Sequence, residues 1–507
     1  MLEALWDAAA DRRDDAAAAE GRAGTIPFRR AGAVRAGRDR VLAPAKDQHA
    51  KRPGVALYHL PDRGVRICAR RTASLFWPVT VVRESPGSTM RGFWRRVGWM
   101  AAILLLGLLT VAAVVAGSSD WPGFQAPGDP EQAAVKTFSE WLDEAQVQAT
   151  TRAQWAAVAR GNAIVVLNSW DFRLIPVLKQ ANPQIQVWVY KDLSGVRSDD
   201  CTVQGGNCGT CTRGVTDSIY LSSGMGYCWV KRNHPDWLLD SAATGRPFEF
   251  KNYPQTWETD YGNASYQRRW VRNVLADVRD HGWDGVKVDN ALTTAAAYGM
   301  AAKYPTDAAV QAATYSALRN IEPALHDAGV PAVFNVGYAT AFPQLWQRWL
   351  GSVDGLEQEF YLSFSSGPNA VGATWSTYED EVSSCATQHK SCWFHSGEYS
   401  DSVTSQTRQY ALASYLLATD GRQYLSVGDV TSKPLEPRLM LGGRLSERFQ
   451  LGASWRRYFV QGIAVVNPSM STLVVPLDGA YLNAGRPVHS IVLGPASGAV
   501  LTAAAGP

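Results

Sequence analysis

The chain has 507 residues, enough for two or three domains of about 150 residues each. Hydrophobic residues make up 46% and charged residues 19%, which allows a large buried core and excludes a chain that is disordered throughout. Residues 118–507 carry 30 basic and 36 acidic side chains, a net charge of −6. Because nucleic-acid binding needs clustered positive charge, we expect no nucleic-acid partner.

The first 89 residues are rich in Ala, Arg and Asp and show no sustained helix or strand periodicity. Met90 stands directly before a basic cluster, at the point where a new pattern begins. We therefore expect residues 1–89 to be an N-terminal extension that is either disordered or not translated, and we base no function on it.

An uncharged stretch of 23 residues, 97–119, follows Arg91, Arg95 and Arg96 and ends in small residues. A basic start, an apolar middle and a small-residue exit are typical of a secretory signal peptide. The stretch is also long enough to span a bilayer if it is not cleaved. We expect residues 90–117 to be a signal peptide or a membrane anchor. The rest of the chain would then lie outside the cytoplasm, secreted or at the cell surface, and would contact the membrane through 97–119 only if the signal stays uncleaved.

Six of the seven cysteines follow this signal, and an even number in an exported region indicates disulfide bonds. They are Cys201, Cys208, Cys211, Cys228, Cys385 and Cys392. The last two close a short loop and form the clearest pair. The other four allow three pairings, which the sequence does not decide, and a zinc site at these four is the alternative.

Short apolar runs alternate with amphipathic stretches from residue 156 to 435. The candidate strands are 163–168, 185–192, 256–260, 285–289, 332–336, 354–360, 392–396 and 423–427. The helical patterns between them are 172–180, 266–280, 308–328, 343–350, 374–388 and 403–419. Eight strands alternating with helices predict a (β/α)8 barrel. An open doubly wound sheet is the alternative, but no Gly-rich phosphate loop follows the first strand.

Three further segments complete the expected organisation. Residues 118–155 indicate a Pro/Gly-rich linker and an N-terminal helix. Residues 195–251 contain four cysteines and indicate a disulfide-rich insertion on the face where barrel active sites lie. Residues 436–507 alternate apolar and polar residues between turn signals, which predicts a small C-terminal all-β domain. The expected fold class is therefore α/β, a TIM barrel followed by a small all-β domain.

Charged residues at the end of the fourth candidate strand are the first indication of chemistry. Side chains alternate along a strand, so Lys287 and Asp289 face the barrel axis. A charged pair inside a barrel is costly unless it serves a purpose. We expect Lys287 to hold Asp289 ionised, as a carboxylate must be to attack an anomeric carbon. A purely structural ion pair is the alternative.

Two glutamates on the sixth candidate strand supply a partner. Glu357 and Glu359 lie two residues apart and so share one face, where one of them could protonate a departing sugar oxygen. Glu359 is nearer the strand end and is preferred, with Glu357 as the alternative. Two carboxylates across a barrel mouth are the usual requirement for glycoside hydrolysis, so we expect hydrolysis of O-glycosidic bonds in a polysaccharide.

Other polar and aromatic residues fall at the expected strand ends. Our candidates for substrate binding are Lys287, Trp170, Asp192, Trp257, Asp260, Tyr261, Asn335 and His395. Each has a structural alternative, namely core packing for the aromatic residues and capping or loop fixation for the polar ones. The histidines at 281, 326 and 389 fall on helices or helix ends, which disfavours a metal-dependent deacetylase or esterase. We expect no metal and no cofactor.

The motif Lys287-x-Asp289 resembles the Lys-x-Asp of alpha-galactosidase-like barrel glycosidases, in which that Asp is the nucleophile. The stretch GWDGVKVDN at 282–290 is similar to the Gly-(Phe/Trp)-Asp-Gly-x-x-x-Asp-Asn of endo-alpha-1,4-polygalactosaminidases. Over residues 160–430 the chain resembles above all the hypothetical glycosyl hydrolase family numbered fifteen in that superfamily, although the motifs are specific only around the third, fourth and sixth candidate strands.

This resemblance implies a TIM barrel with a C-terminal β-domain, but it does not supply a substrate. Our own hypothesis is an alpha-linked polysaccharide. The chain departs from the alpha-galactosidase-like pattern in one respect: the acid/base there is an Asp after the sixth strand, where this chain has Glu357 and Glu359. The competing hypothesis is a non-catalytic carbohydrate-binding or cell-wall-associated barrel. It would share the aromatic cleft but lack a carboxylate pair at hydrolytic spacing.

Overall fold

The computed structural model describes residues 135–202, 210–364, 367–397, 403–428 and 441–504. The expected N-terminal extension at 1–89 and the expected signal or anchor at 90–117 lie outside these residues. Among the described helices, none combines the length and the apolar character needed to cross a membrane.

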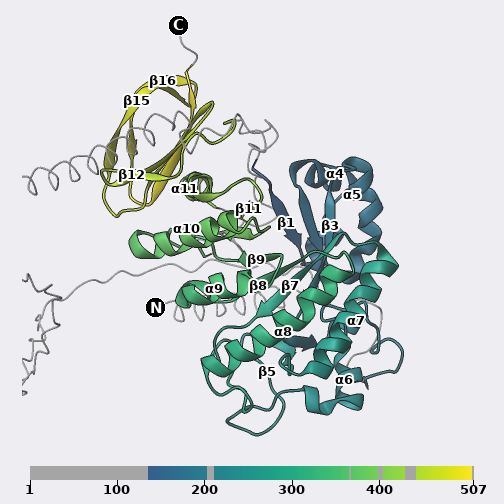
Figure 1. Ribbon diagram of the computed structural model, residues 1–507. Coiled ribbons are helices and arrows are strands. Elements are labelled where there is room, and N and C mark those ends of the chain that lie inside the picture. The colour runs from purple at the N-terminus through teal and green to yellow at the C-terminus, as the bar shows by residue number, and fades with distance from the viewer. Residues whose placement is uncertain (1–134, 203–209, 365–366, 398–402, 429–440, 505–507) are drawn as a thin grey trace, which may run out of the picture. The chain divides into compact units, whose positions relative to one another are not determined.

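Eight parallel strands form one sheet in the order β1-β2-β3-β7-β8-β9-β10-β11. Thr137, directly before β1, bridges Leu425 of β11, and the Leu425 N–H donates to the carbonyl of Lys136 at 2.9 Å. The sheet therefore closes into a barrel, and helices cover its outside (Figure 1). The strands are β1 (Phe138–Trp141), β2 (Ile164–Leu167), β3 (Gln186–Asp192), β7 (Gly285–Ala291), β8 (Ala332–Val336), β9 (Gly355–Gln358), β10 (Trp393–Ser396) and β11 (Tyr424–Val427).

Every connection between neighbouring barrel strands contains helix, which confirms the predicted alternation. These helices are α3 (Glu144–Ala149), α4 (Arg152–Gly161), η2 (Ser169–Leu174), α5 (Ile175–Ala181), α7 (Ala264–His281), α8 (Asp307–Asp327), η6 (Ala339–Ala341), α9 (Pro343–Leu350), α10 (Gly372–Thr387) and α11 (Ser405–Ala418). Their ends follow ordinary capping rules. The Asn263 side chain accepts the Ser265 N–H at the start of α7, and Gly282 ends it with φ 76°, which a residue without Cβ adopts at little cost.

The barrel begins earlier than the expected start at residue 156. Of the expected linker and helix at 118–155, residues 118–134 lie outside the described residues. The rest contains the expected helical structure, α3 and the start of α4, but also the barrel strand β1. Half of β1 is polar, and Glu140 within it points to the buried interior, so the segment lacks the apolar run that marks the other strands. The expected end of the barrel at residue 435 falls among 429–440, outside the described residues.

The predicted third barrel strand, 256–260, is wrong. It overlaps β6 (Tyr253–Glu258), which pairs antiparallel with β4 (Gly195–Arg197) and β5 (Glu249–Phe250) in a separate three-stranded sheet. Exposed and buried residues mix along β6, as in a strand with one face toward solvent, whereas β2 is buried throughout. The expected insertion at 195–251 thus extends through β6.

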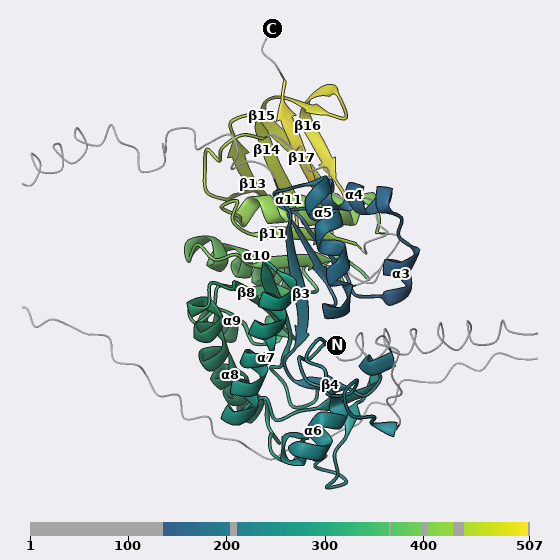
Figure 2. The ribbon, with the colours of Figure 1, turned by 90° about the vertical axis from the view of Figure 1, so that its right-hand side faces the viewer.

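This insertion also contains η3 (Asp200–Thr202), α6 (Tyr227–Asn233) and η5 (Pro235–Trp237). It follows β3 and lies at the end of the barrel away from the C-terminal sheet (Figure 2). One disulfide bond, Cys211–Cys228, lies within it. The side chain of Cys201 and the whole of Cys208 lie outside the described residues.

The predicted disulfide bond Cys385–Cys392 is confirmed, and it joins α10 to the residue before β10. Its seven-residue separation makes a small covalent loop at the start of a barrel strand. The bond therefore restrains the α10–β10 turn.

The predicted C-terminal all-β domain is a six-stranded antiparallel sheet in the order β12-β13-β14-β17-β15-β16. Helix α11 packs against β14 and β17, and buried Arg457 of β13 donates to the carbonyls of Leu416 and Thr419 at the end of that helix, at 3.1 and 2.7 Å. A cation at a helix C-terminus is stabilising, so Arg457 stabilises the contact between the C-terminal sheet and the barrel. The strands are β12 (Phe449–Leu451), β13 (Ser454–Phe459), β14 (Gly462–Asn467), β15 (Leu473–Asn483), β16 (Arg486–Leu493) and β17 (Ser497–Ala503).

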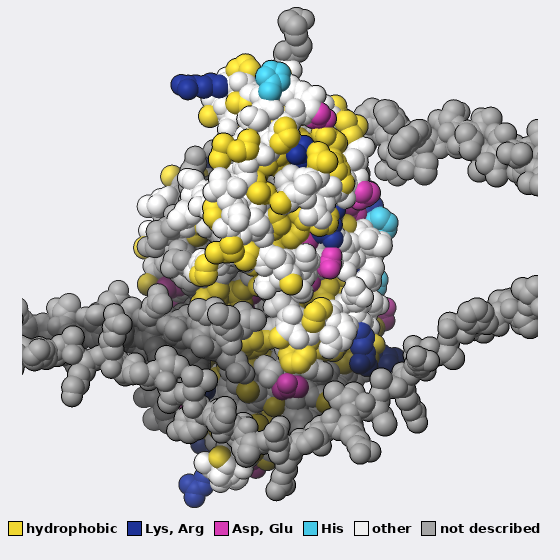
Figure 3. Space-filling view, turned by 90° about the vertical axis from the view of Figure 1, so that its left-hand side faces the viewer, with side chains coloured by type: hydrophobic (Ala, Val, Ile, Leu, Met, Phe, Trp, Pro, Cys, Tyr) yellow, Lys and Arg dark blue, Asp and Glu magenta, His cyan; other side chains and the backbone are white. Residues whose placement is uncertain are grey.

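Apolar side chains also lie on the surface of this domain. Val474 and Val492 face each other across β15 and β16 and are both well exposed. The face in Figure 3 likewise carries hydrophobic side chains spread among uncharged ones, with few Lys, Arg, Asp or Glu.

Candidate active site

A bulge at the carboxyl end of β7 sets the direction of Asp289. The strand pairs in register with β8 up to Val288, and the register shifts before Ala291. Asn290, inside the bulge, has φ 61°, a conformation that Asn adopts more readily than most residues. Bulges re-aim side chains, and here Asp289 and Asn290 both stay half-buried at the barrel mouth.

One amide group joins the two predicted catalytic carboxylates. Nδ2 of Asn335, in β8, donates to Oδ1 of Asp289 and to Oε2 of Glu359, at 2.9 Å each. The two oxygens therefore lie no more than twice 2.9 Å, or 5.8 Å, apart. With the two N–H bonds of the amide about 120° apart and one oxygen on each, the separation is about 5 Å. The structure thus brings together three residues that the sequence indicated separately.

Asp289 accepts hydrogen bonds from two further groups. The Tyr190 hydroxyl donates to Oδ2 at 2.6 Å, and the Asn290 N–H donates to Oδ1 at 2.8 Å. Burial raises the pKa of Tyr190, and the nearby Asp289 raises it further, so the phenol keeps the proton that it donates. Together with Asn335, three groups donate hydrogen bonds to Asp289. An ionised carboxylate can only accept hydrogen bonds, so three donors suit it, and they also fix its orientation.

Asp192, at the end of β3, stands in register beside Asp289. Its Oδ1 accepts the N–H groups of Ser194 and Gly195 at 2.9 and 2.8 Å, and its Oδ2 accepts Nδ2 of Asn290 at 2.9 Å. Burial raises its pKa to about 8, with a further contribution from Asp289. Asp192 therefore supports the bulge and the start of the insertion from beneath the surface.

Aromatic rings adjoin the carboxylates. The Tyr298 hydroxyl donates to Oδ1 of Asn290 at 2.8 Å, and its ring stacks on Phe250 with centroids 4.1 Å apart. Phe360, next to Glu359 in the chain, makes an edge contact with Phe364. Flat apolar faces of this kind stack on sugar rings. Tyr298 was not among the candidates from the sequence because it lies in an irregular connection after β7. A tyrosine shortly after the strand that carries Asp289 was nevertheless a signal in the sequence.

Lys287 lies deeper in the barrel and pairs differently from the expectation. Its Nζ is 2.5 Å from Oε2 of Glu140 and 3.3 Å from Oε2 of Glu357, so its ion-pair partners are these glutamates and not Asp289. Burial alone would lower the pKa of Lys287, but Glu140 and Glu357, with smaller contributions from Asp289 and Glu359, raise it well above its usual value. The ammonium therefore stays charged and acts on Asp289 only through space.

Glu357 and His395 complete this buried cluster. Glu357 is fully buried, and burial followed by Glu140 raises its pKa well above the usual range. Burial lowers the pKa of His395, whose Nε2 lies 2.9 Å from the carbonyl oxygen of Gly428 and donates to it. Ligand atoms of Glu140, Glu357 and His395 lie within 4.8 Å of one another, as a metal site would require. The Lys287 ammonium already supplies a cation to the two glutamates, so we assign no metal to this cluster.

The two tryptophan candidates have partners elsewhere. Nε1 of Trp170, in η2, donates to the carboxylate of Glu144 at 2.8 Å. Trp257, in β6, stacks on Tyr227 of α6 with centroids 4.9 Å apart. Their contacts tie α3 to η2 and α6 to the small sheet.

Asp260 and Tyr261 follow β6, which is not a barrel strand. They therefore do not lie at the end of a barrel strand, as the sequence predicted. Asp260 accepts from the Tyr304 hydroxyl and from Nζ of Lys303, the latter at 2.5 Å. Tyr261 is fully buried in the core. Both positions follow from the incorrect assignment of 256–260 to the barrel.

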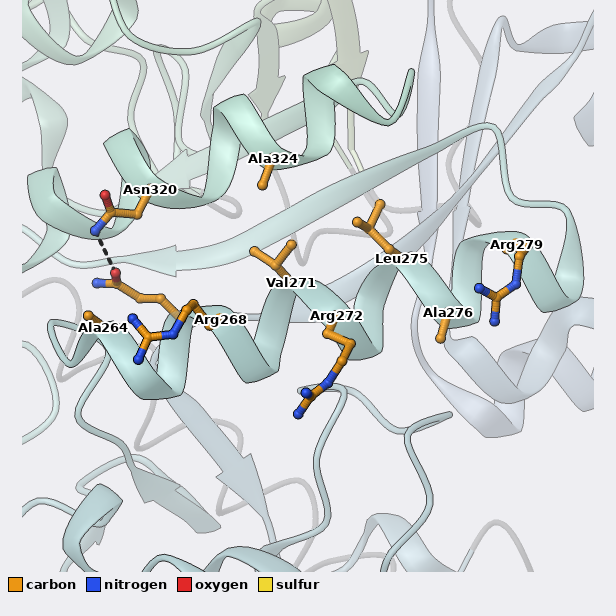
Figure 4. Close-up of a pocket in the computed structure, with 10 residues that line it drawn as sticks. Ala264, Arg268, Val271, Arg272, Leu275, Ala276, Arg279, Asn320 and Ala324 are labelled. Atoms are coloured by element: carbon orange, nitrogen blue, oxygen red, sulfur yellow. Dashed lines mark hydrogen bonds between the residues drawn. The ribbon is translucent and has the colours of Figure 1, made fainter.

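A groove of about 690 Å³ lies on the outer wall of the barrel, between α7 and α8 (Figure 4). Its walls carry Arg268, Arg272 and Arg279, and Nδ2 of Asn320 donates to Oε1 of Gln267 at 2.8 Å across it. The carboxylates and aromatic rings described above lie instead at the ends of β7 and β9, where barrel enzymes hold their catalytic groups.

The structure is a closed (β/α)8 barrel, and two carboxylates at its mouth accept hydrogen bonds from one side-chain amide. This arrangement is that of a glycoside hydrolase. Residues 179–440, 262 of the 507, match the family described as Hypothetical glycosyl hydrolase family 15. The chain belongs to this family and is a glycoside hydrolase. A search of the curated proteins finds no match.

Solved structures that match this chain include three sugar-cleaving or sugar-binding proteins. The glycoside hydrolase domain of PelA from Pseudomonas aeruginosa is 13% identical, covers 59% of this chain and 96% of its own, and has a TM-score of 0.37. Aspergillus fumigatus Ega3 in complex with galactosamine is 12% identical over 61% and 97%, with a TM-score of 0.34. The noncanonic maltogenic alpha-amylase AmyB from Thermotoga neapolitana is 10% identical over 75% and 100%, with a TM-score of 0.42.

Proposed function

We propose that the protein is an exported, retaining glycoside hydrolase that cleaves O-glycosidic bonds in an alpha-linked polysaccharide. One observation carries the mechanism: Nδ2 of Asn335 lies 2.9 Å from both Asp289 and Glu359. Retaining enzymes hold their two carboxyl groups about 5–5.5 Å apart, and inverting enzymes about 6.5–9.5 Å. The upper limit of 5.8 Å between the two bonded oxygens favours retention.

The reaction then proceeds in two steps. Asp289 attacks the anomeric carbon and forms a glycosyl ester, while the bond to the departing sugar oxygen breaks and Glu359 gives that oxygen its proton. In the second step Glu359 takes a proton from water, the hydroxide attacks the anomeric carbon, and the ester bond to Asp289 breaks. Both carboxyl groups return to their starting protonation states.

The hydrogen bonds support this division of roles. Asp289 receives donors from Tyr190, Asn290 and Asn335, which favours an ionised nucleophile in one fixed orientation. Glu359 is half-buried at the mouth, where a leaving sugar oxygen can reach it. Glu357 is fully buried against Lys287, which favours a structural role for it.

Export and linkage rest on separate observations. The bonds Cys211–Cys228 and Cys385–Cys392 are of a kind that persists outside the reducing cytoplasm, and the signal-like stretch 97–119 agrees with them. The resemblance of Lys287-x-Asp289 to the alpha-galactosidase-like motif supports an alpha-linked substrate.

The test uses the wild type and the variants Asp289→Asn, Glu359→Gln and Glu357→Gln on a panel of alpha- and beta-linked polysaccharides. We expect the wild type to release reducing ends from an alpha-linked member, with the product's first anomer matching the substrate by NMR. Loss of either catalytic carboxyl should lower the rate about 10²- to 10⁴-fold, and Glu357→Gln should retain more activity than Glu359→Gln.

Several results would count against the proposal. Inversion at the anomeric carbon would remove the nucleophilic role of Asp289, and full activity of Asp289→Asn would remove it from the chemistry. Binding of a glycan without hydrolysis by the wild type would favour the carbohydrate-binding barrel.

A further inference from the structure

The peptide group between Asp289 and Asn290 is held from the side of β3. The register of β7 with β8 passes from Val288 to Ala291, so the bulge takes this peptide group out of the β8 ladder. Its carbonyl, that of Asp289, instead accepts the Leu193 N–H at 3.1 Å. Its N–H, that of Asn290, donates to Oδ1 of Asp289 at 2.8 Å. The direction of this one peptide group therefore decides whether the Asp289 carboxylate keeps its backbone donor.

The side chain of Asn290 is fixed at both ends of its amide. Its Nδ2 donates to Oδ2 of Asp192 at 2.9 Å, and its Oδ1 accepts the Tyr298 hydroxyl at 2.8 Å. The backbone of Asn290 has φ 61°, in the left-handed region that Asn enters because its short side chain can hydrogen-bond nearby. These two bonds hold Asn290 in that conformation, and they thereby set the direction of the peptide group before it.

Asp192 is built into the structure too firmly to serve a sugar directly. It is only 4% exposed, and its Oδ1 already accepts the N–H groups of Ser194 and Gly195. Its carbonyl accepts Nε1 of Trp270 at 2.9 Å. A Cβ at Gly195 would lie 3.0 Å from Oδ2 of Asp192, so the space beside the carboxylate is filled. A sugar hydroxyl would have to displace these groups to reach Asp192.

We propose that Asp192 is a positioning residue that acts on the nucleophile through Asn290. This inference rests on the proposed function, in which Asp289 attacks the anomeric carbon. The Asp192 carboxylate fixes the Asn290 amide, and the conformation of Asn290 aims its N–H at the Asp289 carboxylate. Misplacing a reacting group by about 1 Å can cost about 100-fold in rate, so a side chain that does not meet the sugar can still set kcat.

The kinetics distinguish this role from substrate binding, which the position of Asp192 at a strand end also suggested. A residue that binds the sugar equally in the ground state and the transition state affects KM and leaves kcat unchanged. A residue that only aligns the nucleophile affects kcat and leaves KM unchanged. We expect the second pattern for Asp192.

The experiment exchanges the two groups. Asp192→Asn turns an NH₂ group toward the Asn290 NH₂ group, and Asn290→Asp turns a carboxylate toward the Asp192 carboxylate. Each single variant should lower kcat about 10- to 100-fold on the polysaccharide that the wild type cleaves, with KM unchanged, and should lower the urea midpoint. In the double variant the amide at position 192 donates to the carboxylate at position 290, which still accepts the Tyr298 hydroxyl. Both kcat and the urea midpoint should then recover most of the loss.

The matched control is Glu258→Gln. Glu258 is also 4% exposed and lies in β6, which pairs with β4 directly after Asp192. No hydrogen bond among the described residues joins it to Asn290, and its Oε2 accepts none. Since this variant makes the same acid-to-amide change in the same part of the insertion, its kcat should equal that of the wild type.

Four results would overturn the proposal: unchanged kinetics in Asp192→Asn, a raised KM with kcat unchanged, a double variant no better than the single ones, or an equal loss of kcat in Glu258→Gln. If the wild type cleaves no polysaccharide, the proposed function fails on its own, and the urea midpoints decide this inference. Recovery of the midpoint in the double variant supports the link between Asp192 and Asn290, and simple addition of the two losses overturns it.

Discussion

The charged cluster inside the barrel makes the sharpest prediction about stability. The Lys287 ammonium lies 2.5 Å from Glu140 and 3.3 Å from Glu357. At an effective dielectric constant of about 20, the attraction between Lys287 and the Glu140 carboxylate is about 7 kcal/mol, most of which offsets the cost of burying the ions. Lys287→Met removes the cation and leaves two buried carboxyl groups facing each other. We expect a loss of about 3–5 kcal/mol, a large part of the 5–15 kcal/mol typical of a domain.

Urea unfolding followed by tryptophan fluorescence measures this loss. The carboxyl groups can take up protons in place of the ammonium, so the loss should be larger at pH 8.5 than at pH 5. Adding Glu140→Gln to Lys287→Met should recover part of it, because the uncompensated Glu140 carboxylate is then gone. If Lys287→Met is as stable as the wild type at pH 8.5, or the second substitution only adds to the loss, the ammonium does not stabilise these carboxylates.

Three further predictions concern single positions. Tyr190→Phe removes the 2.6 Å bond to Asp289, about 1.5–3 kcal/mol for a charged acceptor, so kcat/KM should fall about 10- to 100-fold with the fold intact; an unchanged value would contradict the role given to Tyr190. Burial raises the pKa of Glu381 to about 8 in the folded protein. The protonated Glu381 therefore contributes its full stability below the pKa that it has in the unfolded chain, and this contribution is lost as the pH rises through 8. The urea midpoint should fall between pH 5 and pH 9, and it should fall less steeply in Glu381→Gln. A Cβ at Gly285 would lie 2.5 Å from the ring of Trp188, so Gly285→Ala should cost about 1–3 kcal/mol in the same assay, and no loss would mean that the ring moves freely.

The sequence predicted most of the barrel because its strands leave a simple pattern. Runs such as the Ile164–Leu167 strand are apolar throughout, since helices cover one side and the barrel interior the other. Seven of the eight barrel strands were predicted from short, mainly apolar runs that alternate with amphipathic stretches. The Phe138–Trp141 strand was not, because it places Glu140 inside the barrel, where Lys287 compensates it. No local pattern reveals a charge whose partner lies 147 positions away.

The candidate site, like the barrel, contains features that the sequence reveals and features that it does not. Asp289, Glu359 and Asn335 follow from their positions at strand ends, which the sequence gives directly. The contacts of Tyr190 and Tyr298 depend on the register between strands and on the bulge after Val288, neither of which periodicity encodes. The pairing of Lys287 with glutamates, and not with Asp289, is a consequence of the strand that was missed.

The closure of the barrel between β1 and β11 limits how the chain can be shortened. The family match begins at residue 179, after both β1 and β2. A fragment cut to residues 179–440 would lose the Thr137–Leu425 bridge and leave β3 and β11 as open sheet edges with unpaired backbone groups. Such edges recruit strands from other molecules, so the fragment should aggregate although it carries Asp289 and Glu359, the two proposed catalytic residues. A shortened enzyme should therefore start before Lys136, so that it keeps the contacts of Lys136 and Thr137 with Leu425.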